Sequence, residues 1–414
     1  MNKEMKIFCC FLLGILGLQV GYAQTIQEQE FSKTVDALFE QLDEQKECKN
    51  YQACEAICQK VIDLYDTQKA QLSEGYSYFK YAGYYNQACC QALQGKKQEA
   101  VNSLLKALTD GKLEISYKQL QNDSDLAGIL EAEELKDVLA KLRETTDYLY
   151  ILQKAPAYVR LQVMDSLPQI RYAPATDPDL MRVKQYFQLD SVVKQAKNEL
   201  DSIKCILTYI HNKIRHDGQN GNPINGANSI NYAEACKDGS RGLNCRGLAT
   251  VLNECYLSMG IPSRVVTCMP KTYISDCHVI NAVYSETLGK WLWIDPTNNA
   301  WVTDGQGNML SVQEVRERLR EGLPVQVNEE ANWNNEQQVT TEDYLYDYMA
   351  KNLYYLECWT DYGFGTETGG NKNLNYIFLQ PAGCDSSQRK ARNISVNDDN
   401  FFWQAPFSCF PVGI

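Results

Sequence analysis

Apolar residues between positions 248 and 259 follow the spacing of one buried helix face. They recur 3, 4, 7, 8 and 11 positions after Leu248, as expected for a helix with about 3.6 residues per turn. Gly260 and Pro262 follow. Glycine favours the end of a helix, and proline cannot continue one. The pattern therefore predicts a helix that ends at Gly260 and has Cys245 in its first turn.

Three runs after this helix have the pattern of β-strands. They are short, rich in β-branched or aromatic side chains, and cover residues 263–268, 278–285 and 290–295. The last two runs flank the sequence Glu-Thr-Leu-Gly, which predicts the turn of an antiparallel hairpin. A helix followed by such strands indicates a helix packed on an antiparallel sheet.

The register of this hairpin decides whether two polar side chains meet. If Ser285 pairs with Lys290, then His278 and Asp295 lie on one face as diagonal neighbours, roughly 7–8 Å apart at the backbone. A two-residue turn would keep both on that face but farther apart. A shift of one residue would put them on opposite faces.

The N-terminal part of the chain is predicted to be helical over residues 25–145. It lacks proline and is rich in Leu, Ala, Glu, Lys and Gln. Between positions 84 and 108, Gly95 separates two amphipathic stretches. Small and apolar residues stand where two such helices would touch, at Ala88, Ala100, Leu104 and Ala107. This pattern resembles a tetratricopeptide repeat, with a poorer copy at residues 51–65. The resemblance implies a small helical platform. Two interpretations stay open, plain helical packing without a partner groove and a platform that holds a protein partner.

The remaining segments complete an α+β organisation. Residues 146–185 contain four prolines and are predicted to be a connector. A helix is expected at 191–214, followed by a glycine- and asparagine-rich loop at 216–231 that forms a cleft wall. The central domain spans residues 186–325, and the tyrosine-rich residues 326–414 are expected to be an extension packed on it.

The first 23 residues have the pattern of a secretory signal peptide. Lys3 and Lys6 precede an apolar stretch at 7–18, and a cleavage site follows Ala23. The mature chain is therefore expected to be exported, periplasmic or extracellular, without a membrane span; a retained anchor is the alternative. The net charge of -12 argues against a nucleic-acid partner, because no basic patch would neutralise phosphates. Of 16 cysteines, 14 follow this segment, and we interpret most of them as buried apolar residues or disulfides.

Cys245 is the candidate nucleophile. The unpaired N–H groups of a first helical turn favour an anion and lower the pKa of a thiol. The same groups can bind an oxyanion. With His278 as base and Asp295 to orient it, the sequence predicts a nucleophile–base–orienter triad.

Four motifs in this order resemble the transglutaminase-like superfamily, which has a papain-like fold. They are NCRGLA, GIPSRVV, CHVINAVY and WLWIDPT, within about residues 200–320. The resemblance implies that Cys245, His278 and Asp295 form the catalytic triad. One difference is Arg246, which stands where the well-known cross-linking members carry tryptophan.

Further site residues remain open at this level. Asn228 or Asn231 could supply the second oxyanion donor, and His216 could line the cleft. His211 and His216 lack an acidic partner at metal-ligand spacing, so neither a metal nor another cofactor is predicted. The leading hypothesis is an exported thiol enzyme that attacks a peptide or protein amide and passes the acyl group to water or an amine. The alternative is a non-catalytic binding protein that retains the fold.

Overall fold

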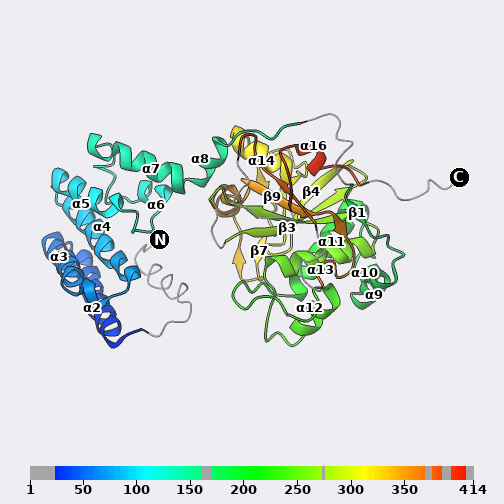
Figure 1. Cartoon of the computed structure of the whole chain (residues 1–414), viewed down its shortest axis with the longest axis horizontal. Helices are drawn as coiled ribbons and strands as arrows, with labels where there is room; N and C mark the ends of the chain where they lie inside the picture. Colours follow the sequence, from blue (N-terminus) through cyan, green and yellow to red (C-terminus); the bar gives the residue numbers. More distant parts are fainter. Residues whose placement is uncertain (1–23, 161–168, 273–275, 369–374, 385–392, 407–414) are drawn as a thin grey trace. The chain divides into compact units, whose positions relative to one another are not determined.

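The structure is a computed structural model that describes residues 24–160, 169–272, 276–368, 375–384 and 393–406. The predicted signal peptide lies outside these residues. The chain forms two compact units, of which the first ends at Asp147 and the second begins at Tyr148 (Figure 1). Helices dominate the first unit and a sheet organises the second, so the predicted α+β class is confirmed. Among the described residues, none of the helices has the length and apolar character needed to cross a membrane.

The first unit is built from helices that pack on their neighbours in sequence. They are α2 (Ile26–Glu47), α3 (Tyr51–Gln68), α4 (Ser77–Leu93), α5 (Lys97–Thr109), α6 (Tyr117–Gln121) and α7 (Lys136–Thr146), with short 3-10 turns at Lys69–Gln71, Glu74–Tyr76 and Glu133–Leu135. The connection between α4 and α5 is three residues long and contains Gly95 with a φ of 76°, a left-handed conformation that suits glycine. Ala88, Ala100, Leu104 and Ala107 are all fully buried in one cluster. The predicted helix pair and its contact positions are confirmed.

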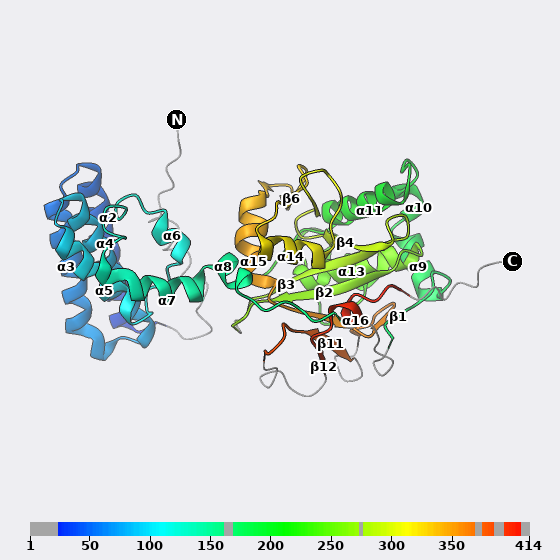
Figure 2. The ribbon, with the colours of Figure 1, turned by 90° about the horizontal axis from the view of Figure 1, so that it is seen from above.

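The second unit is an eight-stranded sheet with helices around it. The strand order is β12-β11-β9-β2-β3-β4-β5-β6 (Figure 2). These strands are β2 (Ser263–Met269), β3 (His278–Ser285), β4 (Lys290–Asp295), β5 (Ala300–Thr303), β6 (Gln326–Val327), β9 (Tyr355–Trp359), β11 (Tyr376–Leu379) and β12 (Asn393–Val396). Pairing is antiparallel throughout, except between β11 and β12.

The other elements of this unit surround the sheet or extend its edges. The helices are α8 (Tyr148–Gln153), α9 (Pro178–Tyr186), α10 (Leu189–Val192), α11 (Glu199–Lys213), α12 (Ser229–Cys236), α13 (Cys245–Ser258), α14 (Val312–Glu321), the π-helical segment η5 (Glu342–Met349), α15 (Ala350–Asn352) and α16 (Asp399–Phe402). Two small sheets pair β1 (Arg171–Tyr172) with β10 (Asp361–Tyr362), and β7 (Asn332–Trp333) with β8 (Gln337–Gln338). Helix α13 packs against β2 and β3.

Strand β4 shows that the sheet is covered on both faces. Leu292 and Ile294 belong to the hydrophobic cluster that includes α11, α12 and α13. Trp291 and Trp293 alternate with them and belong to the cluster that includes α14 and α16. Successive side chains of a strand point to opposite faces. Asp295 therefore continues the tryptophan face at the end of the strand.

Two expected boundaries in this unit differ from the structure. The helix predicted at 191–214 is two helices, α10 and α11, because Asn198 caps α11 with its side chain on the backbone N–H of Asp201. The predicted loop at 216–231 ends early, because Asn228 caps α12 in the same way. Asparagine occurs both in loops and at helix N-caps, so its presence alone did not locate these helix starts.

The tyrosine-rich C-terminal segment contributes to the main sheet. Strands β9, β11 and β12 all come from residues 326–414, and β9 pairs directly with β2. This segment shares the cluster that includes Trp293. Because β6 begins at Gln326, residues 326–414 supply four of the eight strands of the sheet.

Candidate active site

Cys245 is the first residue of α13 because Asn244 caps the helix. The Asn244 side chain accepts a hydrogen bond from the backbone N–H of Gly247 at 3.1 Å. The helix ends at Ser258 with Met259 as its C-cap, and Gly260 follows with a φ of 78°. Start and end both agree with the predicted helix. The N–H groups of the first turn have no partner inside the helix, and the half-buried Cys245 thiol lies beside them.

His278 and Asp295 meet because β3 and β4 pair in the first of the three registers considered. Ser285 pairs with Lys290, and Asn281 with Ile294. His278 Nε2 lies 2.8 Å from Asp295 Oδ2, and both side chains are buried. The other ring nitrogen, Nδ1, remains for Cys245, whose thiol pKa is lowered by the nearby His278. The structure thus brings together the three residues that the sequence predicted as nucleophile, base and orienter.

Asp295 is held by four hydrogen bonds. Besides His278, Oδ2 accepts from Tyr344 Oη at 2.5 Å and from Asn298 Nδ2 at 2.9 Å. The backbone N–H of Thr297 donates to Oδ1 at 2.8 Å. A buried carboxylate is stable only when its oxygens are satisfied in this way. This network fixes the carboxylate that orients His278.

These contacts set the protonation of the three groups. Burial alone would lower the pKa of His278, but the charge of Asp295, its hydrogen bond and the contact with Cys245 raise it to about 10. Burial would raise the pKa of Asp295, but His278, Tyr344 and Asn298 hold it at about 2. Burial would also raise the pKa of Cys245. The contact with His278 and its charge, together with the Val279 backbone N–H, bring it below the ordinary value of 9.0. The arrangement favours a thiolate–imidazolium pair.

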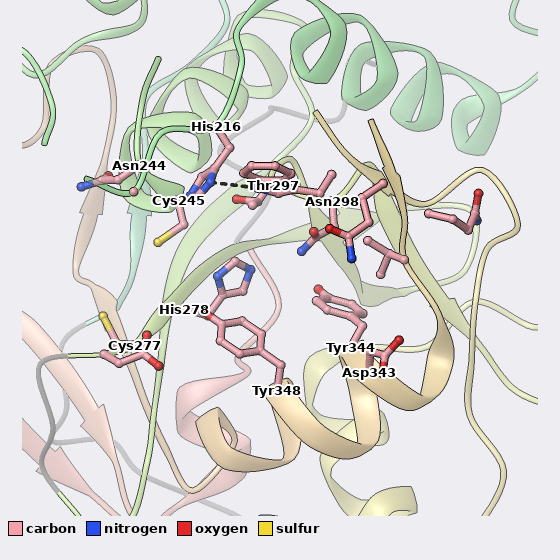
Figure 3. A pocket seen from close by; sticks show the side chains of 16 residues that line it. His216, Asn244, Cys245, Cys277, His278, Thr297, Asn298, Asp343, Tyr344 and Tyr348 are labelled. Carbon is pink, nitrogen blue, oxygen red and sulfur yellow. Dashed lines mark hydrogen bonds between the residues drawn. The ribbon is translucent and has the colours of Figure 1, made fainter. Parts of the chain in front are cut away.

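The nucleophile and base of this triad lie at a cavity of about 530 Å³. Cys245 and His278 line it directly, and Tyr344, which bonds Asp295, lines it too (Figure 3). The other lining residues include Asn244, Cys277, Thr297, Asn298, Trp333, Asp343 and Tyr348. The cavity can hold a small part of a substrate next to the sulfur.

Two of the three further residues predicted from the sequence do not reach this cavity. His216 lines it. Asn228 and Asn231 are not among its lining residues. The Asn228 side chain is used as the cap of α12, and Asn231 Nδ2 donates to Asn225 O at 3.3 Å. The expectation that one of them supplies an oxyanion donor is corrected, because both side chains serve the local turn.

Sequence reasoning missed Tyr344, Asn298 and Trp333. Asn298 could have been found, because it follows the Asp-Pro-Thr motif and can fold back on Asp295. Tyr344 is 49 residues from Asp295 and lies in a stretch with many tyrosines. Trp333 is 117 residues from His216, to which it is hydrogen-bonded. Local patterns carry no signal for such distant pairs.

The cysteines of the described residues are all free thiols, thirteen in number, and Cys245 is one of them. Eight are buried, as expected for small apolar side chains. Disulfides, the other interpretation, are absent from the part of the chain described. Cys277 is exposed and lines the same cavity as Cys245, so the site contains two accessible thiols in different environments.

Metal-ligand side chains converge at one place within the described ranges, which lies in the first unit. Cys89, Asp123 and Asp125 have ligand atoms within 4.8 Å of one another. Asp125 is paired with Lys46 at 2.7 Å, and Asp123 accepts from Tyr85 at 2.5 Å. Because both carboxylates already have partners, this group does not indicate a metal centre.

Comparison with known proteins gives the same class as the geometry. Residues 188–296 match the family model of the Transglutaminase-like superfamily. This part of the second unit is therefore a transglutaminase-like domain, and it contains Cys245, His278 and Asp295.

Comparisons of the whole chain add less. Among proteins with curated descriptions, none matches the chain. Seven chains of solved structures match. One is a crystal structure of a protein from Cytophaga hutchinsonii described as a candidate cysteine protease. It has 15% sequence identity and a TM-score of 0.23, and the match covers 39% of this chain and 55% of that one. A likeness at this level does not establish a shared activity.

Proposed function

We propose that this protein is a thiol-dependent acyl enzyme that cleaves an amide bond of a peptide or protein. The observation that carries the proposal is the pair His278–Asp295 at 2.8 Å, with Cys245 close enough to the same imidazole for its charge to lower the pKa of the thiol. Nucleophile, base and orienter within hydrogen-bond reach define the triad of covalent acyl transfer. The transglutaminase-like domain at residues 188–296 supports the same chemistry.

In the first half of the reaction, Cys245 Sγ attacks the carbonyl carbon and the C–S bond forms. The negative charge moves to the carbonyl oxygen. His278 then gives its Nδ1 proton to the leaving nitrogen, the C–N bond breaks, and a thioester remains on Cys245. Asp295 keeps the imidazole oriented and stabilises its positive charge.

In the second half, water attacks the thioester and gives a proton to His278. The C–S bond breaks, and the acid product leaves with Cys245 restored. An amine could take the place of water, in which case the product is a new amide. We propose water as the acceptor, because water needs no binding site of its own.

Formation of the acyl-enzyme tests this proposal without knowledge of the natural substrate. The full-length protein is incubated with p-nitrophenyl acetate, and the labelled peptide is identified by mass spectrometry. We expect one acetyl group on the peptide that contains Cys245 and none in Cys245→Ala. Acetylation spread evenly over the exposed thiols would contradict the proposal and favour a binding protein. Peptides and cell-wall fragments are then profiled with the same pair of proteins.

We also propose that the protein is exported and cleaved after Ala23. This rests on the charged and apolar pattern of residues 1–23. N-terminal sequencing of the protein recovered outside the cytoplasm should begin at Gln24.

The helices of the first unit contribute none of the residues that line the described cavity. Their α4–α5 pair has small residues at its contact positions, as in a tetratricopeptide repeat, and on this ground we propose that they bind a protein partner.

A further inference from the structure

The ring of His216 is held in one tautomer by Trp333. Trp333 Nε1 lies 3.1 Å from His216 Nδ1, and an indole N–H can only donate. His216 Nδ1 must therefore accept, so the neutral ring carries its proton on Nε2. Within the described ranges, Nε2 has no hydrogen-bond partner in the protein. A donor is thus available at the cavity that His216 lines.

The β7–β8 hairpin holds His216 through two further hydrogen bonds. Asn334 Oδ1 accepts from the His216 backbone N–H at 2.6 Å, and Asn334 Nδ2 donates to the His216 carbonyl at 3.1 Å. Asn334 and Asn335 have φ values of 55° and 59°, as in the tight turns that asparagine favours. Two adjacent residues of one hairpin therefore bind the backbone N–H, the carbonyl and the ring of one histidine.

His216 is fixed beside the segment that leads to Cys245. It forms a parallel bridge with Leu243. The Asp217 N–H donates to Leu243 O at 2.7 Å, and the Leu243 N–H donates to Arg215 O at 3.1 Å. Figure 3 shows the His216 ring on the Cys245 side of the cavity, across from His278. The position is set by the backbone on one side and by the hairpin on the other.

The electrostatics keep His216 neutral. Burial lowers the pKa of His216 below its ordinary value of 6.5, and the positive charge of His278 lowers it further. Asp217 and Asp295 act in the opposite direction but do not outweigh these effects. At neutral pH the ring is an uncharged donor whose one lone pair, on Nδ1, is occupied by the Trp333 N–H.

We propose that His216 Nε2–H is an oxyanion donor, acting with the backbone N–H of Cys245 on the carbonyl oxygen of the substrate. This inference rests on the proposed function and deepens it. The donor makes and breaks no covalent bond; it stabilises the negative charge that develops when Cys245 attacks. Trp333 is a positioning residue, because it acts by fixing the tautomer of His216.

Two reactions of the same thiol separate this role from a structural one. Acylation by p-nitrophenyl acetate passes through an oxyanion, whereas alkylation by iodoacetamide does not. We expect His216→Ala to lower the acylation rate by about 10²–10³-fold, as for loss of one oxyanion donor, and to leave the alkylation rate of Cys245 nearly unchanged. His216→Gln, which retains an N–H donor, should recover part of the acylation rate. Gln337→Ala is the matched control from the same cavity.

Each outcome is informative. Equal losses in both reactions, or no loss in either, would overturn the oxyanion role while leaving the acyl enzyme in place. Absence of acylation in the unmodified protein would instead defeat the proposed function itself.

Trp333→Phe keeps an aromatic ring at this position and removes the indole N–H. It serves as the second variant if His216→Ala does not fold. We expect a smaller loss of acylation and a shift of its pH profile, because Nδ1 can then be protonated. Nitrogen-15 NMR provides a direct view, since the chain has only three histidines. The expected signature at neutral pH is an unprotonated Nδ1 for His216 in the unmodified protein. A protonated Nδ1 there would overturn the inference.

Discussion

Replacing Tyr344 with phenylalanine removes one O–H from a buried chain of hydrogen bonds. Trp293 Nε1 donates to Tyr344 Oη at 3.1 Å, and Tyr344 Oη donates to Asp295 Oδ2 at 2.5 Å. Tyr344 is 3% exposed, and its ring packs edge-on against Trp293. Phenylalanine keeps this packing. The substitution removes the hydrogen bond to Asp295 and the one from Trp293. Only the bond to Asp295 involves an ionisable group, so the pH dependence of the effect reports on that bond.

The expected magnitude follows from the charge of Asp295. A hydrogen bond to a charged group contributes about 1.5–3 kcal/mol, which corresponds to about 1–2 pKa units at 1.36 kcal/mol each. Hydrogen bonds and His278 hold the pKa of Asp295 at about 2, below its ordinary 3.8. A carboxyl group whose pKa is lower in the folded than in the unfolded protein stabilises the fold at pH values above its unfolded-state pKa. This stabilisation is lost as pH falls toward its folded-state pKa. Tyr344→Phe should raise that folded pKa.

Urea unfolding at a series of pH values measures this effect. We expect the free energy of unfolding of Tyr344→Phe to be lower than that of the unmodified protein near neutral pH. The difference between the two proteins should narrow between about pH 4 and pH 2. Tyr348→Phe is the matched control, since Tyr348 lies on the same η5 segment and lines the same cavity. If the two variants have the same pH dependence, the hydrogen bond from Tyr344 does not tune Asp295 and the reasoning is refuted.

Three further predictions follow from the same structure. Asp295→Asn should lower the kcat/KM of amide cleavage by about 10⁴-fold, the loss typical of a triad whose orienting carboxylate is removed; a loss below tenfold would show that His278 is oriented by other groups. Burial raises the pKa of Glu254 from 4.5 to about 7. Ionisation of this carboxyl group therefore lowers the free energy of unfolding as pH rises between those two values. Glu254→Gln should remove about 3 kcal/mol of that pH-dependent loss. The free energy of unfolding, measured with urea at several pH values, would contradict this if the variant lost as much stability over that pH range as the unmodified protein. Deleting residues 24–147 should leave the alkylation rate of Cys245 unchanged, because all the residues that line the cavity lie in the second unit; a large fall in rate would mean that the helices support the site.

The catalytic hairpin and helix could be predicted because their signals are local. The spacing after Leu248 and the break at Gly260 define α13, and the turn between Ser285 and Lys290 defines the register of β3 and β4. Once the register is given, alternation along the strands puts His278 and Asp295 on one face. Nothing beyond about fifty neighbouring residues is needed for this part of the site.

The support around the triad could not be predicted because it comes from distant segments. Tyr344 and Trp333 reach the site from elements that follow the transglutaminase-like match at residues 188–296. In a tyrosine-rich stretch, one hydrogen-bonded tyrosine has the same local pattern as its neighbours. The β7–β8 hairpin is only two residues per strand, too short for an alternation pattern. Both depend on tertiary contacts that periodicity does not encode.

The most direct test of the catalytic triad is the alkylation of two thiols in one cavity. His278 brings the pKa of Cys245 below its ordinary value, whereas burial and the charge of Cys245 raise that of Cys277. Iodoacetamide at mildly acid pH should therefore label Cys245 much faster than Cys277, and His278→Ala should abolish the preference. Equal labelling of the two cysteines in the unmodified protein would contradict a thiolate at position 245.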